Sequence, residues 1–233
     1  MFKQLDANAH GSFIGEPQAT GVRVPESGQL DDLVALEQLG NRRSFARDDE
    51  IYAEGDRADC WFKVVSGTVR ICKLLADGRR HIAEFFFAGD CFGLEGPGER
   101  AFTAEAVGDV ILMRFNRSAT ERLIDERPAL ARRLCNMTLR NLAHAQTRLL
   151  LLGRMTASER VASFLIELAE RRDVRRRLAI PMSRNDIADY LGLTLETVCR
   201  VLSAMKRDGV IAIPHPQRIE ICDREALDAL VEA

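Results

Sequence analysis

Two oppositely charged side chains, Glu196 and Arg200, stand four residues apart in the C-terminal part of this sequence. On a helix, that spacing places both on one face. An arginine can donate two hydrogen bonds to O6 and N7 of guanine, and a glutamate can accept one from N4 of cytosine. The pair therefore predicts contacts with base edges in a DNA major groove. The alternative is an ion pair along the helix, and the two roles are compatible because Glu196 can orient the guanidinium.

The residues around this pair predict a helix-turn-helix. Ser183 with Asp186 three residues later resembles a capping box, Gly192 supplies a left-handed helix end, and Thr194 can cap a second helix. Both helices carry apolar residues at helical spacing, namely Ile187, Ala188, Leu191, Val198, Leu202 and Met205. Two short helices joined by such a turn are typical of DNA-binding proteins, in which the second helix enters the major groove.

Further residues near this motif are candidate DNA contacts. The segment GVIAIPHPQRIEIC (209–222) predicts two strands around a turn, a wing in which His215 and Arg218 are placed to meet phosphates. The segment RRDVRRR (171–177) is either a solvated loop or a further phosphate contact, and residues 223–231 predict a small helix. The predicted DNA-binding residues are Ser183, Arg184, Leu195, Glu196, Thr197, Cys199 and Arg200, with Leu195 on a thymine methyl.

A long helix is predicted over residues 128–152. Its first apolar stripe alternates spacings of four and three residues, as in a coiled-coil seam, and comprises Ala131, Cys135, Thr138, Leu142, Ala145, Leu149 and Leu152. Leu130, Leu134 and Met137 form a second stripe beside it. Two stripes predict two partners, a twin helix on one side and the preceding domain on the other. The alternative is one broad stripe packed within a monomer.

The sequence pattern of the preceding residues 44–115 predicts an antiparallel barrel or sandwich. Short strand-like runs are separated by glycines, and Asp77-Gly78 between two apolar runs is a strong hairpin signal, because glycine readily adopts the positive φ of primed turns. Upstream, residues 30–39 predict a short helix with Leu30, Leu33, Leu36 and Leu39 on one face. Residues 1–27 lack periodicity and are interpreted as an N-terminal arm.

Composition excludes several classes of protein. The 233 residues include 33 Lys and Arg against 35 Asp and Glu, so a nucleic acid must be met by a local basic surface. Apolar runs are far shorter than the roughly 18 residues that span a bilayer, and no secretory signal is visible, so we expect a cytoplasmic protein without a membrane partner. Six cysteines without a CxxC motif indicate reduced thiols. No Walker loop, HExxH or GxSxG is present, so an enzyme is not expected.

Taken in order along the chain, the segments GDRADCWFKVVSGTVRI, DGRR, FFFAGDCFG, SERVASFL and MSRNDIADYLGLTLETVCR resemble the Crp–Fnr family of bacterial transcription regulators over nearly the whole length. The resemblance implies an α+β fold with a cyclic-nucleotide-binding-like antiparallel β-roll (28–127), a dimerisation helix (128–154) and a C-terminal winged helix-turn-helix (155–233). It also implies a homodimer that binds double-stranded DNA and contacts RNA polymerase.

Known branches of the family differ in the cofactor or effector that they bind. The Fnr-type oxygen sensor carries N-terminal cluster-binding cysteines, whereas here no cysteine precedes Cys60. The cyclic-AMP receptor holds the cyclic phosphate with an Arg-Ser pair, whereas here Ala101 follows Arg100. Haem-binding relatives use Cys and His ligands, and the placement of Cys91 and His81 does not make such a pair. We therefore expect no cofactor and no metal.

The recognition pattern Glu-x-x-Ser-Arg of the Fnr branch appears as Glu196 to Arg200, with Cys199 in place of the serine. This combination is similar to the FixK group, which implies activation of genes for low-oxygen respiration and nitrogen fixation at palindromes like TTGA–N6–TCAA. Two interpretations stay open beside it. Oxidation of Cys199 would block DNA docking. Alternatively, a small effector would bind in the roll, in a polar pocket lined by Glu95, Glu99, Arg100 and Thr103.

Overall fold

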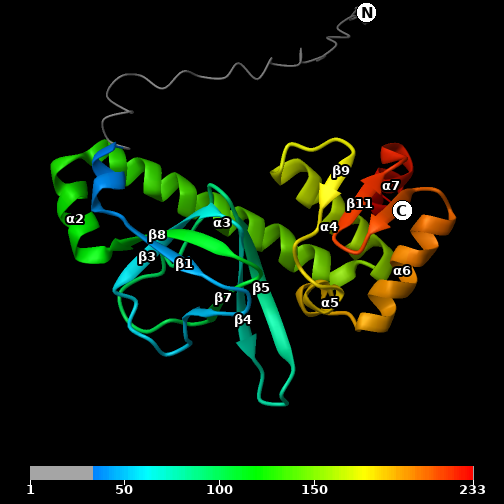
Figure 1. Cartoon of the computed structure of the whole chain (residues 1–233), viewed down its shortest axis with the longest axis horizontal. Coiled ribbons are helices and arrows are strands. Elements are labelled where there is room, and N and C mark those ends of the chain that lie inside the picture. The colour runs from blue at the N-terminus through cyan, green and yellow to red at the C-terminus, as the bar shows by residue number, and fades with distance from the viewer. Residues whose placement is uncertain (1–33, 233) are drawn as a thin grey trace, which may run out of the picture.

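The computed structural model describes the backbone of residues 34–232, and the side chains in that range except those of residues 140, 144, 147–152, 154 and 232. Two parts are joined by the helices α3 (Pro128–Arg154) and α4 (Ala157–Arg171). Figure 1 shows the strand-rich part at one end of α3 and the C-terminal part, built on α4, at the other. The predicted arm (1–27), together with Leu30 and Leu33, lies outside the described residues, while residues 34–39 are helical as expected.

The strand-rich part consists of two antiparallel four-stranded sheets. One has the order β1-β8-β3-β6, formed by Asn41–Phe45, Val110–Asn116, Cys60–Ser66 and Cys91–Phe92. The other has the order β2-β7-β4-β5, formed by Glu50–Tyr52, Thr103–Ala106, Thr68–Leu74 and Arg80–Phe87. Aromatic rings such as Phe62 and Phe92, with centroids 5.2 Å apart, stack in the core between them. This is the β-roll that the resemblance implied.

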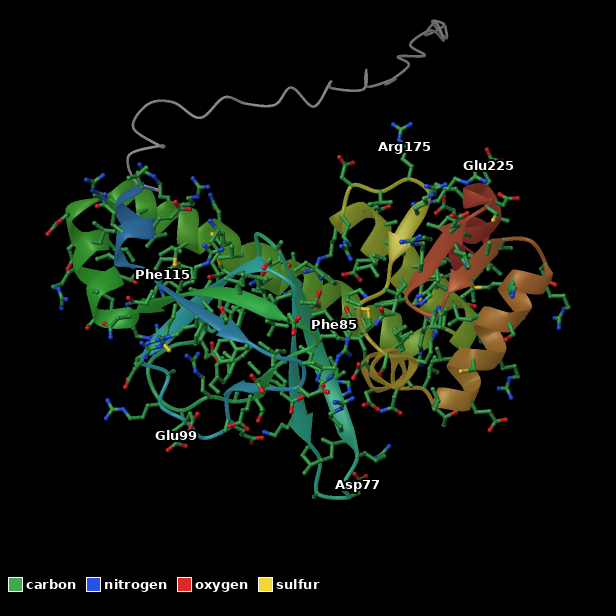
Figure 2. All side chains as sticks on the ribbon, viewed as in Figure 1. Asp77, Phe85, Glu99, Phe115, Arg175 and Glu225 are labelled. Atoms are coloured by element: carbon green, nitrogen blue, oxygen red, sulfur yellow. The ribbon has the colours of Figure 1, made fainter. Side chains whose placement is uncertain are left out.

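The β4–β5 hairpin forms where Asp77-Gly78 predicted it. Gly78 has φ +83°, and the Leu75 amide donates to the Arg79 carbonyl at 2.8 Å to close the turn. The backbone of a residue with a Cβ atom would be strained at this positive φ, which explains the glycine. Figure 2 shows Asp77 at the tip of this hairpin, pointing away from the rest of the molecule.

Helix α2 (Arg117–Glu126) leads from the roll into α3 and was not predicted. Its N-cap is Asn116, whose side chain accepts from the Ala119 amide at 3.1 Å. Trp61 of the roll anchors it, because the indole Nε1 donates to Thr120 Oγ1 at 3.0 Å. Beside it, the second predicted stripe of α3 packs on the roll, with Leu130 buried and with Leu134 and Met137 partly buried. The roll is thus one of the two partners expected for α3.

The C-terminal part combines helices with a small sheet of order β10-β11-β9, formed by Ile211–His215, Arg218–Ile221 and Arg177–Ala179. The helices α5 (Arg184–Leu191), α6 (Leu195–Arg207) and α7 (Arg224–Glu232) surround a core that α4 shares. The wing and the final helix are as predicted, whereas β9 was not predicted and begins at Arg177, the last residue of the segment expected to be a loop or phosphate contact. In the part of the chain that the structure describes, no helix has the length and apolar character needed to cross a bilayer.

Candidate nucleic-acid interface

Helix α5 begins at the predicted capping box. The Asp186 amide donates to Ser183 Oγ at 3.0 Å, and Asp186 Oδ2 accepts from the Ser183 amide at 2.9 Å. The Ser183 hydroxyl also donates to that carboxylate, at 2.8 Å, so it is already engaged within the cap. Gly192 ends the helix in the left-handed region at φ +64°, as predicted. These local bonds set the start and the turn of the helix-turn-helix.

A side chain from α4 stabilises this turn, and sequence reasoning missed it. Arg160 donates from Nη1 to the Leu191 carbonyl at 3.0 Å and from Nε to the Met155 carbonyl at 3.0 Å. It therefore satisfies a carbonyl at the C-terminal end of α5, where carbonyls lack helical partners. Arg160 lies in the segment SERVASFL, but its target is far along the chain, so spacing could not reveal the bond.

Helix α6 buries one face and exposes the other. Thr194 caps it by accepting from the Thr197 amide at 3.2 Å. The predicted inward residues Val198, Leu202 and Met205 are buried, together with Val201. The residues predicted to face DNA lie on the other side, where Leu195, Glu196, Cys199 and Arg200 are exposed and Thr197 is half-buried. The helix therefore presents a polar, charged face to solvent.

The charges on this face do not neutralise each other. Within the described part of α6, Glu196 and Arg200 form no ion pair, and Arg200 Nη2 instead lies 3.5 Å from Thr197 Oγ1. The interpretation of an ion pair along the helix is therefore wrong for this conformation. The carboxylate and the guanidinium are each available to an outside partner, such as the cytosine N4 and the guanine O6 and N7 of a DNA groove.

Arg184 connects three elements at the start of α5. Its Nη2 donates to the Pro216 carbonyl in the wing at 3.2 Å, while its Nη1 is buried without a hydrogen-bond partner among the described residues. Burial lowers the pKa of Arg184, and the nearby Cys199 thiol on α6 opposes that shift. The half-buried guanidinium therefore places a positive charge between α5 and the wing, while its Nη1 donor is closed off from an outside partner.

The wing adjoins this surface, but the basic link does not. His215 and Arg218 are exposed, and the Gln217 carbonyl between them accepts from the Ile180 amide at 2.8 Å. By contrast, Figure 2 shows Arg175 at the outer end of the α4–β9 loop, on the far side of this part from α5. Arg177 of the same segment pairs with Glu220 at 3.3 Å. The segment RRDVRRR is therefore not part of the surface that carries Glu196 and Arg200.

The predicted seam of α3 is largely uncovered. Ala131 is half-buried, whereas Cys135, Thr138, Leu142 and Ala145 are exposed, and the side chains of Leu149 and Leu152 lie outside the described residues. Leu142 exposes 53 % of its surface, and Leu139 next to the seam exposes 55 %. Large apolar side chains this exposed along one helix commonly mark an interaction surface.

Of the residues proposed for an effector pocket, the structure brings Arg100 and Glu95 together and leaves Glu99 apart from them. Arg100 is 2 % exposed, donates from Nη1 to the Gly93 carbonyl at 3.1 Å and pairs with Glu95 at 3.1 Å. Its guanidinium lies over the Tyr52 ring, 4.2 Å from the centroid. Glu99 instead lies exposed on the outer surface of the roll, as Figure 2 shows. The four side chains therefore do not line one pocket together in this structure.

A cavity of about 430 Å³ lies between the roll and α3, lined among others by Phe86, Phe102 and one of the proposed pocket residues, Glu95. Among the described residues that line it, Arg171 is the sole cation. That guanidinium already pairs with Glu84 at 3.2 Å and with Asp90 at 2.8 Å. Its described lining therefore offers no uncommitted cation to a phosphate group.

Comparisons with known proteins agree with this geometry. Residues 159–230 match the Crp-like helix-turn-helix domain family, and residues 42–127 match the cyclic nucleotide-binding domain family. The nitrogen fixation regulation protein FixK of Azorhizobium caulinodans is 44 % identical over 91 % of this chain and 87 % of its own length. The FixK protein of Rhizobium meliloti is 41 % identical over 88 % of this chain and 95 % of its own length.

Solved structures give the same result for the fold. FixK2 from Bradyrhizobium japonicum superposes with a TM-score of 0.80 at 43 % identity, covering 83 % of this chain and 98 % of that chain. A mutant of CooA from Carboxydothermus hydrogenoformans superposes with a TM-score of 0.71 at 19 % identity, covering 84 % of this chain and 90 % of that chain. The second likeness concerns the fold alone.

Proposed function

The chain belongs to the Crp–Fnr family of transcription regulators, with a helix-turn-helix that binds DNA, and from this premise we propose that it is an activator that binds a TTGA–N6–TCAA-type palindrome as a homodimer. The observation that carries the proposal is the exposed, mutually unpaired Glu196 and Arg200 on α6. Arg200 would read the guanine of each half-site and Glu196 a cytosine of the same groove, with Leu195 against a thymine methyl. Arg184 and the wing would position the duplex through phosphates, and Thr197 and Cys199 would border the base edges. Ser183, whose hydroxyl donates to Asp186, would act by holding the start of α5 in place.

The homodimer is supported by the uncovered seam of α3. Two copies of this helix, paired along the seam, would bury the exposed Leu142 and its neighbours. A twofold axis along the pair would then present two α6 helices to half-sites about one helical turn apart, which matches a palindrome. RNA polymerase is the further partner that an activator requires. The target genes would include those of nitrogen fixation, because the FixK relatives are named for nitrogen fixation regulation. The resemblance to the FixK group adds genes of low-oxygen respiration to this proposal.

Inverting one base pair in each half-site of the palindrome tests this function. We expect that exchanging the G·C pair of both half-sites for C·G weakens binding by about 30-fold or more, since each mismatched pair costs about 1–3 kcal/mol and separate positions add. Fluorescence anisotropy measures the affinity for each duplex. The salt concentration is the same for both, because the strength of phosphate contacts depends on salt. Equal affinity for the two duplexes would rule out the proposed reading of the half-site.

Oxidation of Cys199 is expected to abolish specific binding, because a sulfinate on the DNA-facing surface adds bulk and negative charge. Cys60, Cys72 and Cys91 are buried, and burial raises the pKa of the Cys72 thiol to about 11 and that of the Cys91 thiol to about 12, so both stay protonated. The exposed thiols are Cys135, Cys199 and Cys222.

The experiment compares DNA binding before and after peroxide treatment. We expect peroxide to inactivate the wild type and the control Cys222→Ser, while Cys199→Ser keeps its binding. If Cys199→Ser loses binding to the same extent as the wild type, oxidation acts elsewhere and the role given to Cys199 is wrong.

A further inference from the structure

Helix α5, the first helix of the helix-turn-helix, contacts the β-roll. Helix α5 packs against β5, and the rings of Tyr190 and Phe85 meet with centroids 5.0 Å apart. Phe85, Ile82 and Cys72 of the roll belong to one apolar cluster with the core of the C-terminal part. Figure 2 shows Phe85 where the two parts of the molecule meet. The orientation of the helix-turn-helix is thus set partly by the roll.

A cluster of charges lies beside this apolar contact. Arg70 of β4 and Arg80 of β5 both reach Asp186 Oδ1, at 3.3 Å and 2.5 Å respectively. Arg80 also pairs with Asp189, one turn further along α5, at 2.9 Å. The side chains of Arg70 and Asp186 are only 8 % and 5 % exposed. Ion pairs that are so deeply buried constrain the geometry more than exposed pairs do, because breaking one leaves an uncompensated charge.

The two carboxylate oxygens of Asp186 accept hydrogen bonds from different parts of the molecule, one from the roll and one from the start of α5. Oδ1 accepts from the roll arginines, while Oδ2 accepts from the Ser183 amide and hydroxyl at 2.9 Å and 2.8 Å. The same carboxylate therefore starts α5 and connects it to the roll. Any displacement of Asp186 would move the first residues of the helix-turn-helix with it.

The remaining groups of the cluster lie on the roll. Arg70 also binds Glu105 at 2.7 Å and Asp48 at 3.0 Å, which hold its guanidinium in place. Burial alone would lower the pKa of Arg80, but its hydrogen bond to Asp189 and the charges of Asp186 and Asp189 outweigh burial and raise it. Arg80 thus stays charged between the two parts.

We infer that Arg70 and Arg80 are positioning residues for DNA recognition, because they hold the helix-turn-helix at a fixed angle to the roll through Asp186 and Asp189. In a dimer built on the roll and α3, that angle sets the distance and rotation between the two α6 helices. The cluster would therefore determine which gap between half-sites the protein accepts. This inference rests on the proposed function, and it adds a determinant that touches no DNA.

The test uses the full chain and two palindromes, one with the N6 gap and one with the gap lengthened by one base pair, which rotates a half-site by about 35°. We expect the wild type to prefer the N6 duplex by about tenfold or more, and Arg80→Gln to lose about fivefold or more of that preference. A merely structural role of Arg80 would weaken binding to both duplexes equally.

Arg79→Gln is the matched control. Arg79 lies next to Arg80 in the same hairpin, but its side chain is 77 % exposed and pairs with Asp77 at 2.7 Å. We expect this variant to keep the wild-type gap preference. If circular dichroism shows that Arg80→Gln is unfolded, Asp189→Asn provides the same test from the α5 side. The Asp189 side chain is 19 % exposed, pairs with Arg80 and is not part of the cap.

The outcomes separate the two proposals. Folded Arg80→Gln or Asp189→Asn with the full wild-type gap preference would overturn the positioning role and leave the proposed function standing. A wild type that binds both gaps equally would overturn the proposed dimeric recognition, and the positioning role with it.

Discussion

Replacing Arg200 by alanine is expected to weaken binding to the palindrome by about 1–3 kcal/mol, while binding to unrelated DNA changes much less. The reason is that a guanidinium donating twice to guanine distinguishes bases, whereas phosphate contacts act on any sequence. The exposed position of Arg200, without an ion pair to Glu196, leaves its donors available for that contact. Titration of both duplexes at one salt concentration measures the difference.

Arg207→Ala controls for the loss of charge. Arg207 lies at the last turn of the same helix, its side chain is 77 % exposed, and it lies 3.5 Å from Asp208. We expect this variant to weaken binding to the palindrome and to unrelated DNA by similar small factors. An equal loss on both duplexes for Arg200→Ala would instead remove Arg200 from base recognition.

Placing a carboxylate in the α3 seam, as in Leu142→Glu, is expected to prevent dimerisation and to weaken binding to the palindrome by about 10²- to 10⁴-fold. A twofold pair brings the two new charges together across the seam, where like charges repel. Once the dimer is lost, the second half-site no longer binds at the high effective concentration of a tethered partner. Sedimentation of the free protein and a titration of the same sample measure both effects.

The control for this change is Asn136→Glu, which adds the same charge at an exposed polar position of α3 outside the seam. We expect it to leave both the mass and the affinity unchanged. A Leu142→Glu protein that still sediments as a dimer would show that the seam is not the dimer contact.

The helix-turn-helix could be predicted from sequence because its signals are local. The cap at Ser183 and Asp186, the left-handed Gly192 and the inward Val198 each depend on residues within a few positions, and the structure confirms all of them. The β4–β5 hairpin is predictable for the same reason, since a two-residue signal at Gly78 sets its turn.

Features that depend on residues far apart along the chain have no comparable local sequence signal. Asp186 is predictable as a cap, but not as the partner of Arg70, which lies 116 residues away along the chain. Arg100 was expected in a polar pocket and is instead buried against Tyr52, because sequence does not reveal whether a loop side chain turns inward. Strand β9 was missed because Arg177–Ala179 is too short to show an alternating pattern, and its partner β11 lies far along the chain.

Selection of bound sequences from a random DNA pool, with the number of chains per duplex measured by sedimentation of the same complex, is the most direct test of the account. Paired α6 helices predict two inverted half-sites about one helical turn apart, each with an invariant G·C pair, and two chains on each duplex. A single half-site without symmetry, or one chain on each duplex, would contradict recognition by paired α6 helices.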